Sequence, residues 1–147
     1  MIVNTLKTIL NRDLNKLMLE IAAYQEETNL WKISGDIKNS AGNLCLHLIG
    51  NLNTYIGAAL GNSGYIRNRE LEFSLKDVPK SELLIMIEQT ITIVNETLNQ
   101  LKEEELQKEY AIKVFENKTT TGFFLVHLAT HLAYHLGQIN YHRRIID

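Results

Sequence analysis

A single proline, Pro79, occurs among the 147 residues of this chain. Proline interrupts helices, and four long stretches of the sequence carry apolar residues at helical spacing. These stretches run from about 3 to 30, 40 to 60, 80 to 105 and 121 to 144. The first has an apolar stripe formed by Leu6, Leu10, Leu14, Leu17 and Ile21. In the third, apolar residues at alternating steps of three and four predict a buried seam of Leu84, Ile87, Ile91, Val94, Leu98 and Leu101. Four helices of this length predict an all-α fold, a four-helix bundle.

The connections between the predicted helices indicate their order. The long one covers residues 65–78 and ends at Pro79, where a helix can begin. A connection of this length lets the third helix run parallel to the second, which gives an up-down-down-up bundle. A simple up-down order remains open. No repeat or linker divides the sequence, so we expect one domain over residues 1–147.

Composition limits the classes of function. Fifteen Lys and Arg against seventeen Asp and Glu give a formal net charge of −2, which argues against nucleic-acid binding through basic charge. One cysteine excludes an intramolecular disulfide framework and a multi-cysteine zinc site. The first residues are too polar for a signal peptide, and no stretch is apolar enough to span a bilayer. We expect a soluble cytoplasmic protein that acts on a small molecule, without a nucleic-acid or membrane partner.

Two of the predicted helices lack charge. Residues 39–66 and 119–142 contain no Asp, Glu, Lys or Arg, so we expect these helices to be enclosed, or one of them to lie in a subunit interface. Their polar residues form narrow stripes. The earlier helix carries Asn43, His47, Asn51 and Thr54. The last helix carries, within an arc of about 80°, His127, His131, His135, Gln138 and His142.

The two stripes together indicate a metal site. If the helices run antiparallel, His47 meets His131 and His135, which are four residues apart on one helix. Imidazole suits Zn, Ni, Cu or Fe, and three protein ligands leave a position for water or substrate. The groups available to bond the second ring nitrogens are Asn43, Asn51, Gln138 and His127. The alternative is that all these histidines are core residues bonded to neighbouring polar side chains.

Two helix motifs resemble a known family. The run HLATHLAYHLGQI over 127–139 resembles the last helix of DinB-like proteins, and NSAGNLCLHLIGNL over 39–52 resembles their second helix. The connection GNSGYIRNRELEF over 61–73 looks like an uncharacterised bacterial branch of that superfamily. The resemblance covers nearly the whole chain. It implies an up-down-down-up bundle, often a homodimer, with a divalent metal held by His47, His131 and His135.

The resemblance also implies a chemistry. Some DinB-like proteins use their metal to activate a low-molecular-weight thiol such as bacillithiol, mycothiol or glutathione, whereas others have no assigned activity. We therefore expect a metal-dependent thiol transferase or hydrolase that activates a thiol or water against a small electrophile. The metal, whether zinc, nickel or iron, stays open. The alternative is a non-catalytic metal-binding module for stress response or dimerisation. His127 and His142 fall outside the matched trio, and we expect His127 beside the ligands.

The remaining residues have two interpretations each. The charged cluster Arg67, Arg69, Glu70 and Glu72 is either a solvated, self-paired loop or a clamp in which Arg67 and Arg69 hold an anion over the site. Cys45 is expected to be a small buried apolar residue. No internal Asp or Glu is identified as a general base, and neither a nucleophile elbow nor a glycine-rich phosphate loop occurs.

Overall fold

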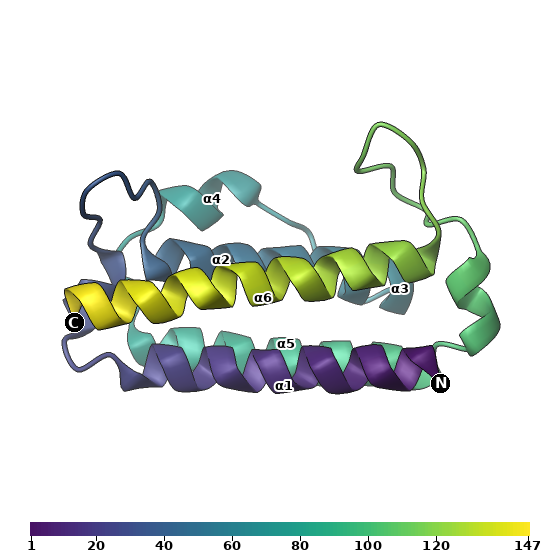
Figure 1. The fold of residues 1–147 in the computed structure, drawn as a ribbon, viewed down its shortest axis with the longest axis horizontal. Coiled ribbons are helices and arrows are strands. Elements are labelled where there is room, and N and C mark those ends of the chain that lie inside the picture. Colours follow the sequence, from purple (N-terminus) through teal and green to yellow (C-terminus); the bar gives the residue numbers. More distant parts are fainter.

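Four long helices form the bundle in the computed structural model, which describes residues 1–147 (Figure 1). They are α1 (Ile2–Ala23), α2 (Ala41–Leu52), α5 (Lys80–Gln100) and α6 (Thr121–Ile146). A π-helical turn (Asn53–Ala58) and α3 (Ala59–Gly61) continue α2. The ends of the first and third predicted helices are separate 3-10 turns at Glu27–Trp31 and Glu103–Gln107. The predicted all-α class is confirmed.

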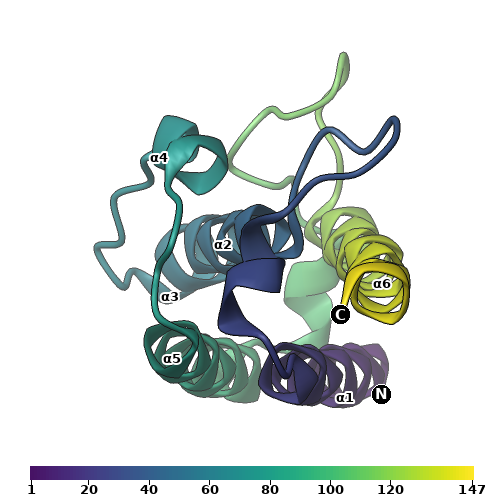
Figure 2. The same ribbon diagram turned by 90° about the vertical axis from the view of Figure 1, so that its left-hand side faces the viewer.

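The order of the helices is up-down-down-up, as predicted. In Figure 1, α1 and α6 run in one direction, and α2 and α5 run in the other. Figure 2 looks along the bundle and shows α2 beside α6 in one half and α5 beside α1 in the other. The chain after α3 returns along the bundle before α5 begins, which makes α5 parallel to α2. Helices α2 and α6, which carry the polar stripes, are therefore antiparallel neighbours.

The long connection contains a short helix, α4 (Arg69–Ser74), where the sequence predicted an irregular loop. The side-chain oxygen of Asn68 caps it by accepting a hydrogen bond from the backbone N–H of Leu71, at 3.3 Å. The amide of Asn43 in α2 donates to the carbonyl oxygens of Glu72 and Leu75, each at 2.9 Å. Asn43 thus fastens α4 against α2, beside the polar stripe.

The core follows the predicted pattern on α1 and departs from it on α5. All five residues of the α1 stripe are buried. On α5 the sequence predicted the seam Leu84, Ile87, Ile91, Val94, Leu98 and Leu101, but the buried line is Leu83, Ile87, Thr90, Val94 and Leu98. Thr90 is accepted there because its hydroxyl donates to the carbonyl of Met86, at 2.8 Å, and accepts from the amide of Asn53, at 2.9 Å.

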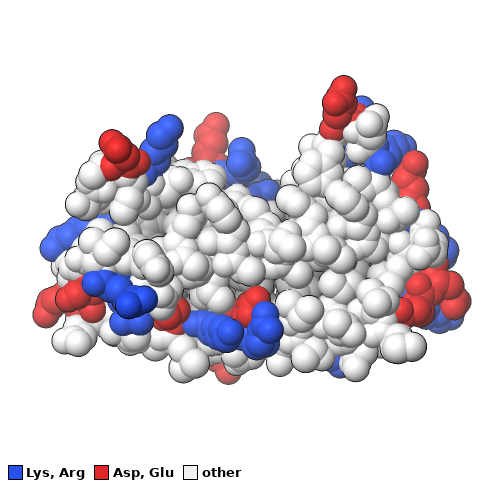
Figure 3. All heavy atoms as spheres, in the orientation of Figure 1, with Lys and Arg blue, Asp and Glu red and all other residues white.

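The two charge-free helices have different surroundings. Every residue of α2 is buried, as expected. The single chain does not enclose α6, which exposes large side chains such as Phe123, Tyr134 and Tyr141, so the alternative that α6 lies in a subunit interface stays a prediction. Figure 3 shows the resulting broad surface without charged side chains. None of the helices combines the length and apolar character needed to cross a bilayer.

Candidate metal centre

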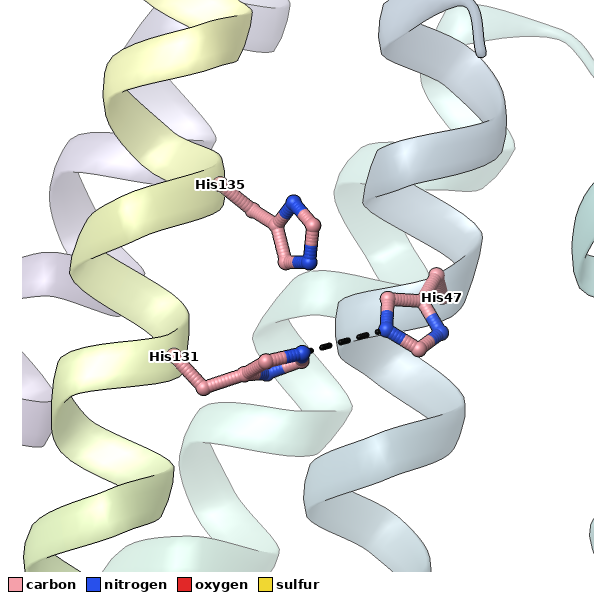
Figure 4. Close-up of side chains that lie close together, drawn as sticks. All are labelled: His47, His131 and His135. Atoms are coloured by element: carbon pink, nitrogen blue, oxygen red, sulfur yellow. Dashed lines mark hydrogen bonds between the residues drawn. The ribbon is translucent and has the colours of Figure 1, made fainter. Parts of the chain in front are cut away.

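Three imidazoles meet where α2 packs against α6. His47 comes from α2, and His131 and His135 come from successive turns of α6 (Figure 4). Each ring offers one nitrogen, and these three atoms all lie within 4.8 Å of one another. Nε2 of His47 lies 3.3 Å from Nε2 of His131. The antiparallel packing therefore brings together the three residues that the sequence singled out.

The spacing of these nitrogens fits a metal ion. Two nitrogens bound to a tetrahedral zinc ion at about 2.0–2.1 Å lie roughly 3.3 Å apart. The observed His47–His131 separation of 3.3 Å matches this value. Imidazole nitrogens are ligands of the kind that divalent transition metals prefer. The three histidines can thus hold a metal ion.

The outer nitrogen of His47 is fixed by an ion pair. Nδ1 of His47 lies 3.1 Å from Oε1 of Glu72. The Arg67 guanidinium donates to both oxygens of the same carboxylate, at 2.8 and 2.9 Å. Because a carboxylate only accepts, His47 carries its proton on Nδ1 and donates it to Glu72. The lone pair of His47 is then on Nε2, which faces the other two histidines.

Glu72 was not identified from the sequence as a site residue, although its side chain is only 6% exposed. Burial alone raises the pKa of Glu72, but the hydrogen bonds from His47 and Arg67 outweigh it and hold the pKa below its ordinary value. The carboxylate rests on the backbone of α2 at Gly50, where an added Cβ would lie 1.9 Å from Oε2. Only glycine allows the carboxylate to approach the helix backbone this closely. A glycine within this apolar helix is therefore the sequence feature that could have indicated the contact.

The two α6 histidines of the trio, His131 and His135, differ in the partners of their second ring nitrogens. Nδ1 of His135 donates to Oε1 of Gln138 at 2.7 Å, which leaves Nε2 of His135 with the lone pair. Nδ1 of His131 is buried without a partner. Burial, together with His135 and His47, lowers the pKa of His131 to about 4. Burial also lowers the pKa of His135, although Gln138 opposes this. Both rings are neutral at pH 7, the form that coordinates metals.

The other polar residues of the stripes lie apart from the ligand nitrogens. Asn43 bonds α4 rather than an imidazole. The side chain of Asn51 makes no hydrogen bond, and its oxygen is buried. His127 packs its ring against Phe115 and Phe124, at centroid distances of 4.8 and 5.6 Å, and does not bond His131. His142 is buried far along α6 and bonds other groups.

Comparison with known proteins places this bundle in a family. The family model described as "Protein of unknown function (DUF1572)" matches residues 3–147. The chain belongs to the DUF1572 family. Its fold is similar to the crystal structure of a conserved protein from Enterococcus faecalis, with a TM-score of 0.76 and 20% identity over 97% of this chain and 95% of that one. No curated protein matches the sequence.

Two cavities border the histidines of this DUF1572 protein. One, of about 680 Å³, is lined by His135 and Gln138 and by the exposed tyrosines Tyr134 and Tyr141. The other, of about 390 Å³, lies on the side of His47 and His131. The buried Cys45 borders neither cavity, and burial raises the pKa of its thiol to about 12, so it is an apolar core residue as expected. Small molecules can therefore approach the trio from solvent.

Proposed function

We propose that this protein binds a divalent metal ion through His47, His131 and His135 and uses it to activate a small thiol or a water molecule against a small electrophile. The observation that carries the proposal is the convergence of three imidazole nitrogens, two of them 3.3 Å apart, beside cavities open to small molecules. The resemblance of the two helix motifs to DinB-like proteins supports the same ligand set. It also supports the choice of thiol chemistry.

Each residue around the trio has a defined task in this proposal. Glu72 holds the proton of His47 on Nδ1, and Gln138 does the same for His135, so both rings direct Nε2 inward. Arg67 balances the charge of Glu72 and keeps that carboxylate ionised. The fully buried α2 keeps bulk water away from one side of the site. A divalent ion supplies a lowered pKa for a thiol or water bound to it.

Metal binding is the first test. The purified protein is stripped with a chelator and titrated with Zn²⁺, Ni²⁺ and Fe²⁺ in competition with a coloured chelator. We expect one ion per chain for the wild type and a large loss of affinity for His131→Ala. His127→Ala is the matched control, because this histidine lies one turn earlier on α6 and bonds no ligand. Equal metal affinity in wild type and His131→Ala would mean that the three histidines are core residues and not metal ligands.

Turnover is the second test. The metal-loaded protein is assayed with bacillithiol, mycothiol and glutathione against model electrophiles, and with water as the nucleophile against activated esters. We expect thiol-dependent product formation that disappears in His131→Ala. A protein that binds metal but turns over no substrate would instead be a non-catalytic metal-binding module, which is the alternative that the sequence leaves open.

We also propose that the protein is a homodimer that uses the uncharged surface of α6. DinB-like proteins are often homodimers, and the exposed side chains of Phe123, Val126 and Tyr134 on α6 are more apolar than a solvated helix requires. Light scattering on wild type and Val126→Lys tests this arrangement. A dimer that dissociates on substitution is expected, and a wild-type monomer would contradict it.

A further inference from the structure

The smaller cavity beside the trio has a composition that the metal site alone does not need. Its volume of about 390 Å³ lies in the range of small-molecule pockets. His47 and His131 form one part of its wall, and Arg67 and Arg69 form another. A molecule in this cavity would touch His47, His131 and the two arginines at the same time.

Asn51 is the second observation that points to a ligand. It lies one turn after His47 on α2, lines the same cavity, and is only 7% exposed. Its side-chain oxygen is buried without a donor, and no group of the chain bonds its amide. Buried amides are almost always hydrogen-bonded in native proteins, because leaving one unpaired destabilises the fold. A bound molecule that donates to Asn51 would supply the missing partner.

The charges of the cavity select the kind of molecule. Glu72 neutralises Arg67 through two hydrogen bonds, but one terminal nitrogen of Arg67 bonds nothing in the chain. Arg69 has no ion pair, and its guanidinium lies over the ring of Phe73 at 5.6 Å. No carboxylate lines the cavity. Imidazoles carry no negative charge that could offset the charge of a divalent ion, so the loaded cavity would be strongly positive.

We propose that this cavity is the substrate pocket and that it binds a small carboxylate. The carboxylate lies against Arg69 and the free nitrogen of Arg67, and a donor group of the same molecule bonds Asn51. The inference rests on the proposed function in one respect: the reacting group of this molecule is the one placed at the trio. It deepens that function by identifying the substrate class as small organic acids. Planar guanidinium groups favour carboxylates through paired hydrogen bonds.

A pair of thiols that differ only in charge tests the pocket. The full-length protein is loaded with Co²⁺, and its visible spectrum is followed during titration with 3-mercaptopropionate and, separately, with 3-mercapto-1-propanol. We expect the carboxylate to bind about tenfold more tightly, which corresponds to one hydrogen-bonded ion pair. In Arg69→Gln this preference falls to about twofold or less. Arg144→Gln is the matched control, because Arg144 is also exposed and lies over an aromatic ring, Tyr141, at 5.5 Å.

The outcomes separate this inference from the metal proposal. If Co²⁺ binds but wild type shows no preference for the carboxylate, or Arg69→Gln keeps it, the pocket proposal is wrong and the metal proposal stands. If Co²⁺ does not bind, the metal proposal fails. The pocket is then judged by calorimetric titration of the metal-free protein with succinate. Binding that weakens in Arg69→Gln supports the pocket, and absent or unchanged binding overturns it.

Asn51→Leu gives an independent readout. If Asn51 serves to bind a ligand, its unpartnered amide destabilises the free protein. Replacing it with an apolar side chain then raises the melting temperature by about 2–4 °C. The same variant binds 2-hydroxy-3-mercaptopropionate, whose hydroxyl donates to Asn51, several-fold more weakly, whereas 3-mercaptopropionate, which has no such donor, keeps its affinity. A lowered melting temperature would mean that Asn51 has a structural role. Unchanged affinity for 2-hydroxy-3-mercaptopropionate would show that Asn51 does not take part in the pocket.

Discussion

Two histidines of the same helix, His142 and His131, show what separates a packing histidine from an open one. His142 is 4% exposed and uses both ring nitrogens: Nδ1 accepts from the hydroxyl of Tyr24 at 2.6 Å, and Nε2 donates to the carbonyl of Lys32 at 2.8 Å. His131 has a buried Nδ1 without a partner, and its Nε2 faces another imidazole. The chain supplies hydrogen-bond partners for both ring nitrogens of His142 but leaves Nδ1 of His131 without one. A buried polar atom without a partner indicates a site for a ligand.

The largest expected effect comes from removing the open histidine. His131→Ala takes away one of three ligands, so metal affinity falls by more than the roughly 10–100-fold that loss of an outer partner causes. Calorimetric titration with Zn²⁺ measures it, with His127→Ala as the control. A zinc affinity of His131→Ala within about threefold of wild type would show that His131, like His142, is a packing residue and not a metal ligand.

Removing His142, whose ring nitrogens are both hydrogen-bonded, is expected to lower stability and to leave metal affinity unchanged. His142→Ala leaves the Tyr24 hydroxyl and the Lys32 carbonyl without partners and opens a cavity at the bundle end. We expect the free energy of unfolding to fall by about 2–4 kcal/mol, with metal affinity unchanged. Urea denaturation measures the stability, and the same zinc titration measures the affinity. A loss of zinc affinity in the folded variant would show that His142 also serves the site.

A smaller effect is expected from the group that orients His47. Glu72→Gln keeps the shape but weakens the hydrogen bond to Nδ1, so metal affinity falls by about 10–100-fold. Gly50→Ala is also expected to lower metal affinity, because the added Cβ displaces the carboxylate of Glu72. Zinc titration of both variants checks this relation. Unchanged affinity in both, with an intact fold by circular dichroism, would exclude Glu72 from the site.

The smallest effect concerns pH in the metal-free protein. The pKa of His131 is lowered from its ordinary value of 6.5 to about 4, chiefly by burial. As the pH falls below about 6.5, the unfolded chain takes up this proton before the folded one does. Stability from His131 is therefore present above pH 6.5 and is lost between pH 6.5 and 4. Urea denaturation across this range measures the slope, and His131→Leu should flatten it.

Helical periodicity predicted the bundle and its order because long helices joined by one long connection leave few arrangements. It also predicted which histidines meet, since the antiparallel packing of α2 and α6 follows from that order. It placed two positions of the α5 seam one residue away, at Leu84 and Ile91 instead of Leu83 and Thr90. A threonine in the seam depends on a hydrogen bond from Asn53, which no single-helix pattern contains.

The partners of the trio were harder to predict. Gln138 was identified because it lies three residues after His135 on the same helix face. Glu72 was missed because it lies on α4, in a stretch that periodicity assigns to a loop, and its burial depends on the tertiary contact at Gly50. The exposed face of α6 was missed for the converse reason: absence of charge does not show whether a second chain or this one covers a helix.

Anomalous X-ray scattering from crystals of the zinc-loaded protein tests the central claim most directly. We predict one zinc peak per chain, about 2.0–2.1 Å from Nε2 of His47, His131 and His135, with at least one further coordination position open toward a cavity. A peak bound elsewhere, or crystals in which the imidazole of His47 turns away from a metal held by α6 alone, would contradict the account.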